Sequence, residues 1–444
     1  MSSVLIDIVA VAFILGFMIL IHEFGHYAVA KLLGVRVEQF AIGFGTRLVG
    51  FRKGETDYRI NALPFGGYVK MSGENPMDAR TGDPREFMSH PRWHRFLIAV
   101  AGPAMNILLA IGLLTGVYMV HYEYVAFEDQ PVVINWVEQD SPASKIGLQR
   151  GDRITQADNI QNPTWQQFGR KVLLSPNQPL PLTVERDGQV LQKTLVPEPL
   201  GSSEMGYDGL EAKHSLEVTE LEPDMPAEKA GIKVGDTLVA LNGQPLPALG
   251  AMIDALKISK DQPIQLTVLR NSQQQTFTLK PVLNDEDELD KRYRVGIGSA
   301  PIIVMPLHFS AALQHSIDDN KKLSVMIVEL MEKLVQRKVS MRAVSGPIGI
   351  AQAAGSAAQK KGWMPLIELT SGISLNLGIF NLMPIPILDG GVILFLLIEG
   401  LLRRDISLAV KERVYQAAFV FLVLFAVMVI YNDIAKTLPS MRLP

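Results

Sequence analysis

Two histidines and a glutamate lie close together near the start of the chain. Residues 21–30 read IHEFGHYAVA, and they follow the apolar stretch VLIDIVAVAFILGFMIL at 4–20. On a helix, His22 and His26 lie one turn apart, about 6 Å along the axis and on the same face. Their ring nitrogens can therefore reach one tetrahedral zinc ion. Glu23 borders that face, where it can take a proton from a water molecule that zinc acidifies, which is the chemistry of metal-assisted hydrolysis.

The apolar surroundings make these polar residues informative. An ionisable group inside a membrane helix is costly, roughly 2.5–3.5 kcal/mol for Asp or Lys on insertion scales. Such groups become tolerable when they bind a metal and face a wet cavity, and the alternative is a chance HEFGH in a helix. The other histidines lie in polar or boundary stretches, where we expect ordinary surface residues: His90, His94, His121, His214, His308 and His315.

A catalytic zinc needs a third protein ligand. The acidic residues within apolar runs are Asp7, Glu368, Asp389 and Glu399. Asp389 stands out because its segment, SLNLGIFNLMPIPILDGG at 374–391, contains helix-breaking prolines and two glycines that allow close backbone approach. Irregular backbone at membrane depth occurs only where it is buried in protein or lines a water cavity. A kinked helix whose Asp389 caps a half-helix explains the same residues, and spacing does not decide, because about 360 residues separate Asp389 from the histidines.

Composition limits the class of protein. The 444 residues exceed one ordinary core, and 48% of them are hydrophobic, so we expect several domains and a membrane protein. The net charge of -3 gives no reason to expect a nucleic-acid partner. The absence of cysteine excludes disulfides and thiolate metal sites.

Four apolar stretches predict a multi-pass membrane protein in contact with the lipid bilayer. They are 4–21, 97–120, 366–402 and 415–431, and the third is interrupted by Asn, Pro and Gly. Lysines and arginines follow the first stretch, precede the second and separate the last two, which predicts cytoplasmic loops there. Both termini and residues 121–365 then lie on the other side. If the source is a Gram-negative bacterium, that side is the periplasm and the protein lies in the inner membrane. A cleaved signal peptide is the alternative for the first stretch, but residues 1–3 carry no Lys or Arg.

The middle of the chain contains an internal repeat. SPASKIGLQRGD at 141–152 and MPAEKAGIKVGD at 225–236 are offset by 84 residues, and Arg186 and Arg270 keep the same offset. A shared period over many positions predicts two copies of one domain. Each copy resembles a bacterial PDZ domain, which implies binding of peptide ends or unfolded segments by strand addition. Two structural spacers with unused grooves are the alternative.

Two further segments carry regular patterns. Residues 44–71 alternate apolar and polar side chains about a Lys-Gly turn, which predicts a β-hairpin and a strand. That this β-hairpin is membrane-associated is implied only by the family resemblance given below. An edge there could pair with an unwound substrate. Residues 309–345 show helical periodicity, which predicts an amphipathic helix at the membrane surface or one packed on the second repeat. Its apolar face is expected to contain Leu313, Ile317, Met326, Leu330 and Leu334.

Together these motifs resemble the site-2 family of intramembrane zinc metalloproteases. The resemblance rests on HEFGH in a first membrane helix, NxxPxPxLDGG in a late one, and tandem PDZ domains between them. It implies that His22, His26 and Asp389 bind zinc and that Glu23 is catalytic. It implies substrate contacts by Asn376 and Asn381, and by Gly67, Tyr68 and Val69 of the hairpin. The family often has His after LDGG, where this chain has Val392, and the segment 345–352 also resembles a family segment.

The resemblance implies an intramembrane zinc endopeptidase that cuts single-pass membrane proteins. Its expected substrate is an anti-sigma factor already trimmed on its outer side, and remnants of signal peptides are a second class. The PDZ pair would exclude substrates with bulky outer domains. A membrane-tethered PDZ scaffold without catalysis is the alternative, and a transporter explains only the interrupted third segment.

The expected organisation follows from these segments. It comprises a first transmembrane helix (1–35), the β-loop region (36–95), a second helix (96–121), PDZ domains (127–200 and 210–283), amphipathic helices (303–350), a third transmembrane segment (364–402) and a fourth helix (413–433).

Overall fold

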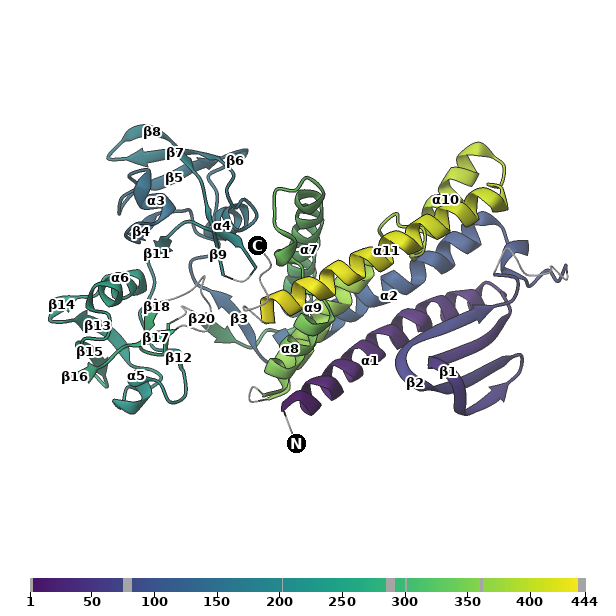
Figure 1. Ribbon diagram of the computed structural model, residues 1–444, viewed down its shortest axis with the longest axis horizontal. Helices are drawn as coiled ribbons and strands as arrows, with labels where there is room; N and C mark the ends of the chain where they lie inside the picture. Colours follow the sequence, from purple (N-terminus) through teal and green to yellow (C-terminus); the bar gives the residue numbers. More distant parts are fainter. Residues whose placement is uncertain are drawn as a thin grey trace. The chain divides into compact units, whose positions relative to one another are not determined.

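The computed structural model describes residues 3–74, 82–201, 203–284, 292–299, 302–359 and 362–437, and the side chains of 3–13, 64, 65, 359 and 437 lie outside this description (Figure 1). The chain divides into two compact units. The helical unit comprises Met1–His121, Pro306–Ile327 and Ser345–Pro444, and the duplicated unit comprises Tyr122–Met305 and Val328–Val344. Each unit is described by itself.

Long helices form most of the helical unit (Figure 1). They are α1 (Ser3–Leu32), α2 (Arg92–Tyr118), α8 (Pro347–Gln359), α9 (Met364–Asn381), α10 (Asp389–Leu402) and α11 (Leu408–Thr437). Helix α2 is central, because α1, α9 and α10 all pack against it. Within the described residues, two helices are long and apolar enough to cross a membrane, Arg92–Tyr118 and Leu408–Lys436.

The third apolar stretch is a broken helix, as its prolines predict. Helix α9 ends at Asn381 and α10 begins at Asp389, and Pro384 and Pro386 lie in the irregular segment between them. The two glycines after Asp389 are required by close packing. A Cβ atom on Gly390 would lie 2.1 Å from the Met383 carbonyl oxygen, and one on Gly391 would lie 2.4 Å from that of Ile385. Any larger residue would therefore push this segment away from the start of α10.

Helix α8 begins in the segment 345–352 that resembles a family motif. The carboxylate of Asp433, on α11, accepts hydrogen bonds from the backbone N–H groups of Gly346, Ile348 and Gly349 at 2.9–3.0 Å. These N–H groups at a helix start have no intrahelical acceptor, so Asp433 caps α8. Further along α8, Ala354 is buried in a cluster with Ile14 and Met18 of α1.

The predicted hairpin is a folded sheet. Strands β1 (Val37–Lys53) and β2 (Thr56–Met71) meet at a turn, and Gly54 there has a positive φ of 63°. Residues 39–42 pair with 67–70 on one side and with 57–60 on the other, and 57–60 also pair with 49–52. The resulting order of segments is 49–52, 57–60, 39–42, 67–70. Segment 67–70 is therefore an outer strand with an edge that no other described strand covers.

The duplicated unit contains the same arrangement of elements twice. The first copy consists of β4 (Ile134–Val137), α3 (Pro142–Lys145), β5 (Arg153–Ala157), β6 (Ile160–Gln161), α4 (Trp165–Leu173), β7 (Leu180–Arg186), β8 (Gln189–Leu195), β9 (Glu198–Leu200), β10 (Met205–Tyr207) and β11 (Leu210–Ala212). The second consists of β12 (Glu220–Leu221), α5 (Pro226–Lys229), β13 (Thr237–Leu241), β14 (Gln244–Pro245), α6 (Leu249–Ser259), β15 (Ile264–Arg270), β16 (Gln273–Leu279), β17 (Val282–Asn284), β18 (Arg292–Arg294) and β19 (Ile297–Gly298). The four-stranded sheets have matching orders, β6-β5-β7-β8 and β14-β13-β15-β16.

Each copy of the repeat extends beyond the range expected from the sequence, 127–200 for the first and 210–283 for the second. Strand β11 pairs with β4, and β19 pairs with β12, so each copy is closed by strands after residues 200 and 283. These last strands are offset by 87 residues instead of 84. The added residues take them out of the register that made the repeat visible in the sequence.

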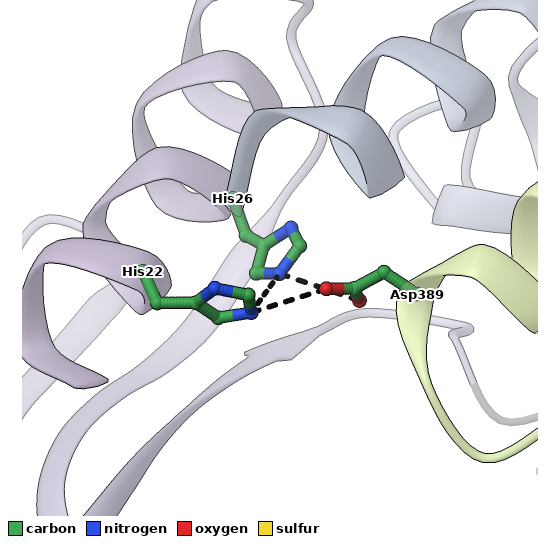
Figure 2. A group of neighbouring side chains, drawn as sticks. All are labelled: His22, His26 and Asp389. Atoms are coloured by element: carbon green, nitrogen blue, oxygen red, sulfur yellow. Dashed lines mark hydrogen bonds and ion pairs between the residues drawn. The ribbon is translucent and has the colours of Figure 1, made fainter. Parts of the chain in front are cut away.

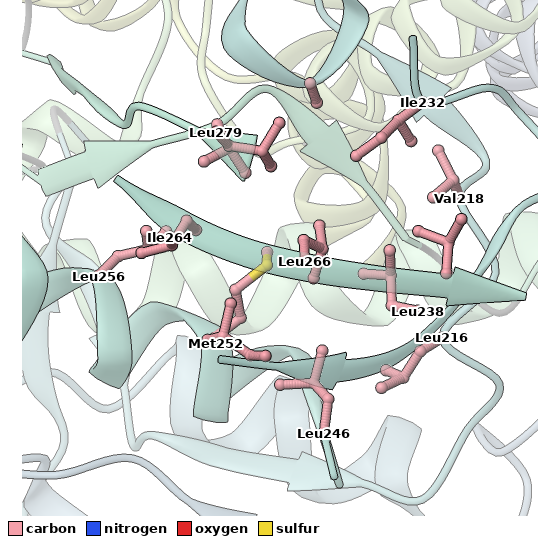
Figure 3. Close-up of a cluster of buried hydrophobic side chains, with 14 residues drawn as sticks. Leu216, Val218, Ile232, Leu238, Leu246, Met252, Leu256, Ile264, Leu266 and Leu279 are labelled. Carbon is pink, nitrogen blue, oxygen red and sulfur yellow. The ribbon is translucent and has the colours of Figure 1, made fainter. Parts of the chain in front are cut away.

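The core of the second copy shows how the pattern produces the fold (Figure 3). Ile264, Leu266 and Val268 alternate along β15 and are all buried, because successive side chains on a strand point to opposite faces. They pack against Met252 and Leu256 of α6. Each residue of this kind contributes about 1.5–3 kcal/mol on burial.

Polar contacts join the two copies. The Glu211 carboxylate of the first copy accepts the N–H groups of Leu249 and Gly250 at the start of α6, at 2.9 and 2.7 Å. Asp254 of α6 accepts from the Trp136 indole at 3.2 Å. His214, expected at the surface, has a side chain only 8% exposed, and its Nε2 lies 2.9 Å from the Glu211 carboxylate.

The segment predicted to form an amphipathic helix buries mostly small and polar side chains. Helix α7 (Phe309–Val335) buries Ala312, Ser316, Asn320 and Ile327, whereas Ile317 is 45% exposed. The Ser316 hydroxyl donates to the Ile111 carbonyl of α2 at 2.8 Å, and Asn320 donates to the Ser316 carbonyl at 2.7 Å. Small and polar side chains thus face α2.

Outside these elements, β3 (Tyr122–Val125) pairs with β20 (Ile302–Met305).

Candidate metal centre

Two imidazoles from α1 meet at one point in the helical unit. His22 and His26 are one turn apart, both are buried, and their Nε2 atoms lie 3.2 Å from each other (Figure 2). The ring planes are nearly perpendicular, with centroids 4.9 Å apart. This is the common face that the spacing in HEFGH predicts.

Asp389 joins them from the other end of the chain (Figure 2). It is the first residue of α10, so the irregular segment after α9 determines where its carboxylate lies. Its Oδ2 is 3.1 Å from His22 Nε2, and its Oδ1 is 3.5 Å from His26 Nε2. The structure therefore brings together three residues whose convergence the spacing did not decide and the family resemblance implied.

The other acidic candidates have different surroundings. Glu399 is buried and pairs with Lys411 at 2.6 Å, and it also accepts the Ile406 N–H at 3.1 Å. Asp7 lies among the residues whose side chains are outside the described part of the chain. Within the described residues, His22, His26 and Asp389 form the one group of three or more such side chains that could hold a metal ion.

The spacing of the three donors fits zinc. Bonds of about 2.0–2.1 Å in a tetrahedron place neighbouring donor atoms about 3.3 Å apart. The separations of 3.1, 3.2 and 3.5 Å lie around that value. Two neutral imidazoles and one carboxylate are a donor set found in catalytic zinc sites, with a fourth position left for water or substrate.

Helix α2 contacts both imidazole rings. The sequence analysis did not predict these contacts. His26 Nδ1 donates to the Ile98 carbonyl at 2.7 Å, and Asn106 Nδ2 lies 3.1 Å from His22 Nδ1. A Cβ atom on Gly102 would lie 2.3 Å from His26 Nε2, so only glycine fits there. A buried Asn in the apolar run LIAVAGPAMNILL was the available signal, because polar side chains at membrane depth are expensive.

Glu23 lies beside the donors in a cavity of about 260 Å³. Tyr68 and Val69 of the outer strand segment line this cavity. A Cβ atom on Gly67 would lie 3.5 Å from Glu23 Cγ, so this strand passes directly against the glutamate. Val392, which replaces the family's His, lines the cavity too.

Asn376 and Asn381 are not among the residues that line this cavity. Both lie on α9 and are partly exposed. The described structure thus brings the hairpin residues to the candidate centre and leaves the two asparagines apart from its lining.

The chain contains two helices able to span a membrane, and it places a His–His–Asp set beside a glutamate. This combination is typical of a metal-dependent hydrolase of the membrane. Comparison with known proteins gives the family. The model of peptidase family M50 matches residues 10–425, and the chain belongs to this family of zinc metalloproteases, the site-2 proteases.

Full-length relatives carry consistent names. The chain is 31% identical to a putative zinc metalloprotease of Vibrio cholerae and 31% identical to the regulator of sigma-E protease RseP of Salmonella typhimurium, over 98% of this chain and 100% of each relative. It is 29% identical to a putative zinc metalloprotease of Treponema pallidum, over 97% of this chain and 99% of that protein. Within the family, the sequence motifs resemble those of the regulator of sigma-E protease, and the Salmonella relative agrees with that resemblance.

Proposed function

We propose that this protein is an intramembrane endopeptidase that cuts single-pass membrane proteins within the bilayer. The observation that carries the proposal is the His22, His26 and Asp389 donor set beside Glu23 and the uncovered edge of segment 67–70. A peptide bond inside a helix is shielded by the surrounding turns. An edge strand offers an alternative set of backbone hydrogen bonds to a substrate segment that has unwound.

In this proposal, His22, His26 and Asp389 hold zinc. When bound, the ion lowers the pKa of a water molecule towards 7 and polarises the substrate carbonyl. Glu23 accepts the proton of the attacking water and returns it to the departing amine. The outer strand, with Gly67, Tyr68 and Val69, holds the substrate in an extended form against Glu23.

The resemblance to the family supports further substrate contacts by Asn376 and Asn381. Neither lines the described cavity, so a bound substrate would have to reach α9 to contact them. Photo-crosslinking from these two positions to a substrate tests that assignment separately from catalysis.

The proposed topology has four membrane-crossing segments: α1, α2, the broken α9–α10 segment and α11. Both termini and the duplicated unit then lie in the periplasm of a bacterial inner membrane. The two copies are proposed to be PDZ domains that exclude substrates with bulky outer domains and bind peptide ends or unfolded segments. An anti-sigma factor trimmed by an earlier cleavage is the expected substrate, and remnants of signal peptides are a second class.

The test is cleavage of purified single-pass proteins by the full chain in lipid vesicles, with and without their outer domains. We expect about one zinc per chain, cleavage of the trimmed substrates, loss of cleavage with a chelator, and recovery on adding zinc. Cleavage that persists in zinc-free protein would contradict the proposed chemistry. A chain that binds no zinc and cuts nothing would favour an inactive scaffold.

A further inference from the structure

The two histidines of the candidate centre have different partners on α2. His26 Nδ1 faces a backbone carbonyl, that of Ile98, at 2.7 Å. His22 Nδ1 faces the side-chain amide of Asn106 at 3.1 Å. A carbonyl oxygen can only accept a hydrogen bond, whereas an amide can donate or accept, depending on which of its ends faces the ring.

This difference determines where each ring carries its proton. Because the Ile98 oxygen accepts, His26 must be protonated on Nδ1, which leaves the lone pair of Nε2 facing the donor set. For His22, the Asn106 Nδ2 group donates to an unprotonated Nδ1. The His22 proton then sits on Nε2, where it can be donated to Asp389 Oδ2 at 3.1 Å. In that tautomer, His22 Nε2 has no lone pair to offer a metal.

The Asn106 side chain has an unused acceptor. It is fully buried, and its Oδ1 finds no hydrogen-bond donor among the described residues. A half-turn of the amide exchanges Oδ1 and Nδ2, so that the oxygen faces His22 Nδ1. The oxygen then accepts Nδ1–H and leaves the lone pair of Nε2 free.

The backbone around Asn106 is held firmly, so a half-turn of the amide moves little else. The Asn106 carbonyl accepts the Ser374 hydroxyl of α9 at 2.9 Å. Gly102, one turn earlier on the same face of α2, lets both rings approach the helix. The side chain therefore stays against His22 in either orientation.

We propose that Asn106 is a positioning residue that selects the tautomer of His22, donating to Nδ1 without metal and accepting Nδ1–H with metal. The inference rests on the proposed function, in which His22, His26 and Asp389 are the zinc ligands. Partners of this kind that fix a ligand's tautomer typically contribute 10–100-fold to metal affinity.

Zinc affinity of the full-length protein tests the inference. The variants are Asn106→Leu, which has similar volume and cannot accept, and Asn106→Asp, which can only accept when ionised. We expect Asn106→Leu to weaken zinc binding about 10–100-fold in competition with a chromophoric chelator, and Asn106→Asp to bind at least as tightly as the parent protein. A role in helix packing alone predicts the opposite order, because a buried carboxylate disturbs an apolar interface more than leucine does.

Thr115→Val is the matched control, because the Thr115 hydroxyl donates to the Ile111 carbonyl in the same helix and has no other hydrogen bond among the described residues. Its zinc affinity should be unchanged. A second readout is the nitrogen-15 NMR signal of His22, which should report protonation at Nε2 without zinc and at Nδ1 with zinc.

The outcomes separate the two proposals. A parent protein that binds no zinc contradicts the proposed function. A parent protein that binds zinc, with Asn106→Leu binding equally tightly or with His22 in one tautomer throughout, overturns the role of Asn106 and leaves the proposed function intact.

Discussion

Both units of the molecule contain aspartates with little solvent exposure, but the partners of these aspartates differ. They are arginines in the duplicated unit and histidines in the helical unit. In the duplicated unit, Asp152 receives two hydrogen bonds from Arg186 at 2.6 and 2.7 Å, and Asp236 receives the same pair from Arg270. In each copy the arginine also donates to a glycine carbonyl at 2.8 Å. In the helical unit, Asp389 instead lies beside the Nε2 atoms of His22 and His26, at 3.1 and 3.5 Å.

The difference separates an acid that stabilises a fold from one that can hold a ligand. A bidentate arginine neutralises the carboxylate and fixes its geometry, which leaves no room for another cation. Two imidazoles are neutral when they act as ligands, so Asp389 keeps a charge that a metal ion can balance. The repeat therefore conserves its ion pair in both copies, whereas the helical unit assembles its acid and bases once, from distant segments.

The largest expected effect comes from removing the acid of the helical unit. Asp389→Ala should lose zinc and all cleavage without preventing membrane insertion, because two histidines and water form a much weaker site. Asp389→Asn keeps the shape and the capacity to cap a helix but is a poorer ligand, so it should lose zinc as well. Bound zinc and cleavage are the measurements.

Full zinc occupancy in Asp389→Ala would remove this residue from the centre. Glu412→Ala is the suitable control, because Glu412 is exposed on α11 and bonds to Gln416 at 3.3 Å. Glu399 is unsuitable, since its removal would leave Lys411 buried without its ion-pair partner.

Glu23→Gln should keep zinc but slow cleavage by about 10²–10⁴-fold, since an amide cannot take a proton from water. Glu74 lines the same cavity and provides the matched comparison. Glu74→Gln should cut at a rate near that of the parent protein. If instead Glu74→Gln is inactive and Glu23→Gln is active, the general base has been assigned to the wrong glutamate.

Breaking the ion pair of the second copy should affect stability and leave the chemistry unchanged. The Arg270 guanidinium holds the pKa of Asp236 below its ordinary value, against the opposing effect of burial. Arg270→Leu leaves this acid buried without its partner and should cost about 3 kcal/mol. Hydrogen exchange of β15 and β16 in the full chain measures the loss, with zinc content unchanged and Arg186→Leu as the equivalent change in the first copy.

The pH dependence of that loss has a defined sign. Because the pKa of Asp236 is lowered in the folded protein, its pair contributes stability above the unfolded value near 3.9. The contribution disappears as the pH falls through the folded pKa. Parent protein and Arg270→Leu should therefore become similar in acid, and a difference that grows towards low pH would refute this account.

Removing the duplicated unit should have the smallest effect on chemistry. Val125 and Ile302 are cross-strand partners in the ribbon of β3 and β20. Residues 126–301 can therefore be replaced by an Asn-Gly turn that joins adjacent strand ends. The shortened protein should retain cleavage of trimmed substrates and gain cleavage of substrates with bulky outer domains. If it inserts normally but cuts nothing, the duplicated unit does more than select substrates.

The features predicted well from the sequence are those that a short segment or a period determines by itself. The face shared by His22 and His26 follows from their spacing, and the repeat follows from the matching positions around Asp152 and Asp236. The break before Asp389 follows from two prolines. These features need no knowledge of neighbouring helices.

The features that the sequence did not reveal depend on packing between elements. Gly102 and Asn106 matter because α2 lies against the two imidazoles, and nothing in their own segment states which helix they face. Ser316 of α7 donates its hydroxyl to a carbonyl of α2, and the apolar periodicity of its own segment does not indicate this contact. The distance along the chain did not show that Asp389 meets the histidines, and only the family resemblance implied it.

The position of these donors along the chain has a consequence for biosynthesis. His22 and His26 emerge from the ribosome near the beginning of translation, and Asp389 follows about 360 residues later. At a translation rate of about 5–20 residues per second, Asp389 is synthesised roughly 20–70 s after the two histidines. Asp433, which caps α8 beside α1, is made later still. The nascent protein thus passes through the membrane-insertion machinery, among other newly made membrane segments, before its hydrolytic centre is complete.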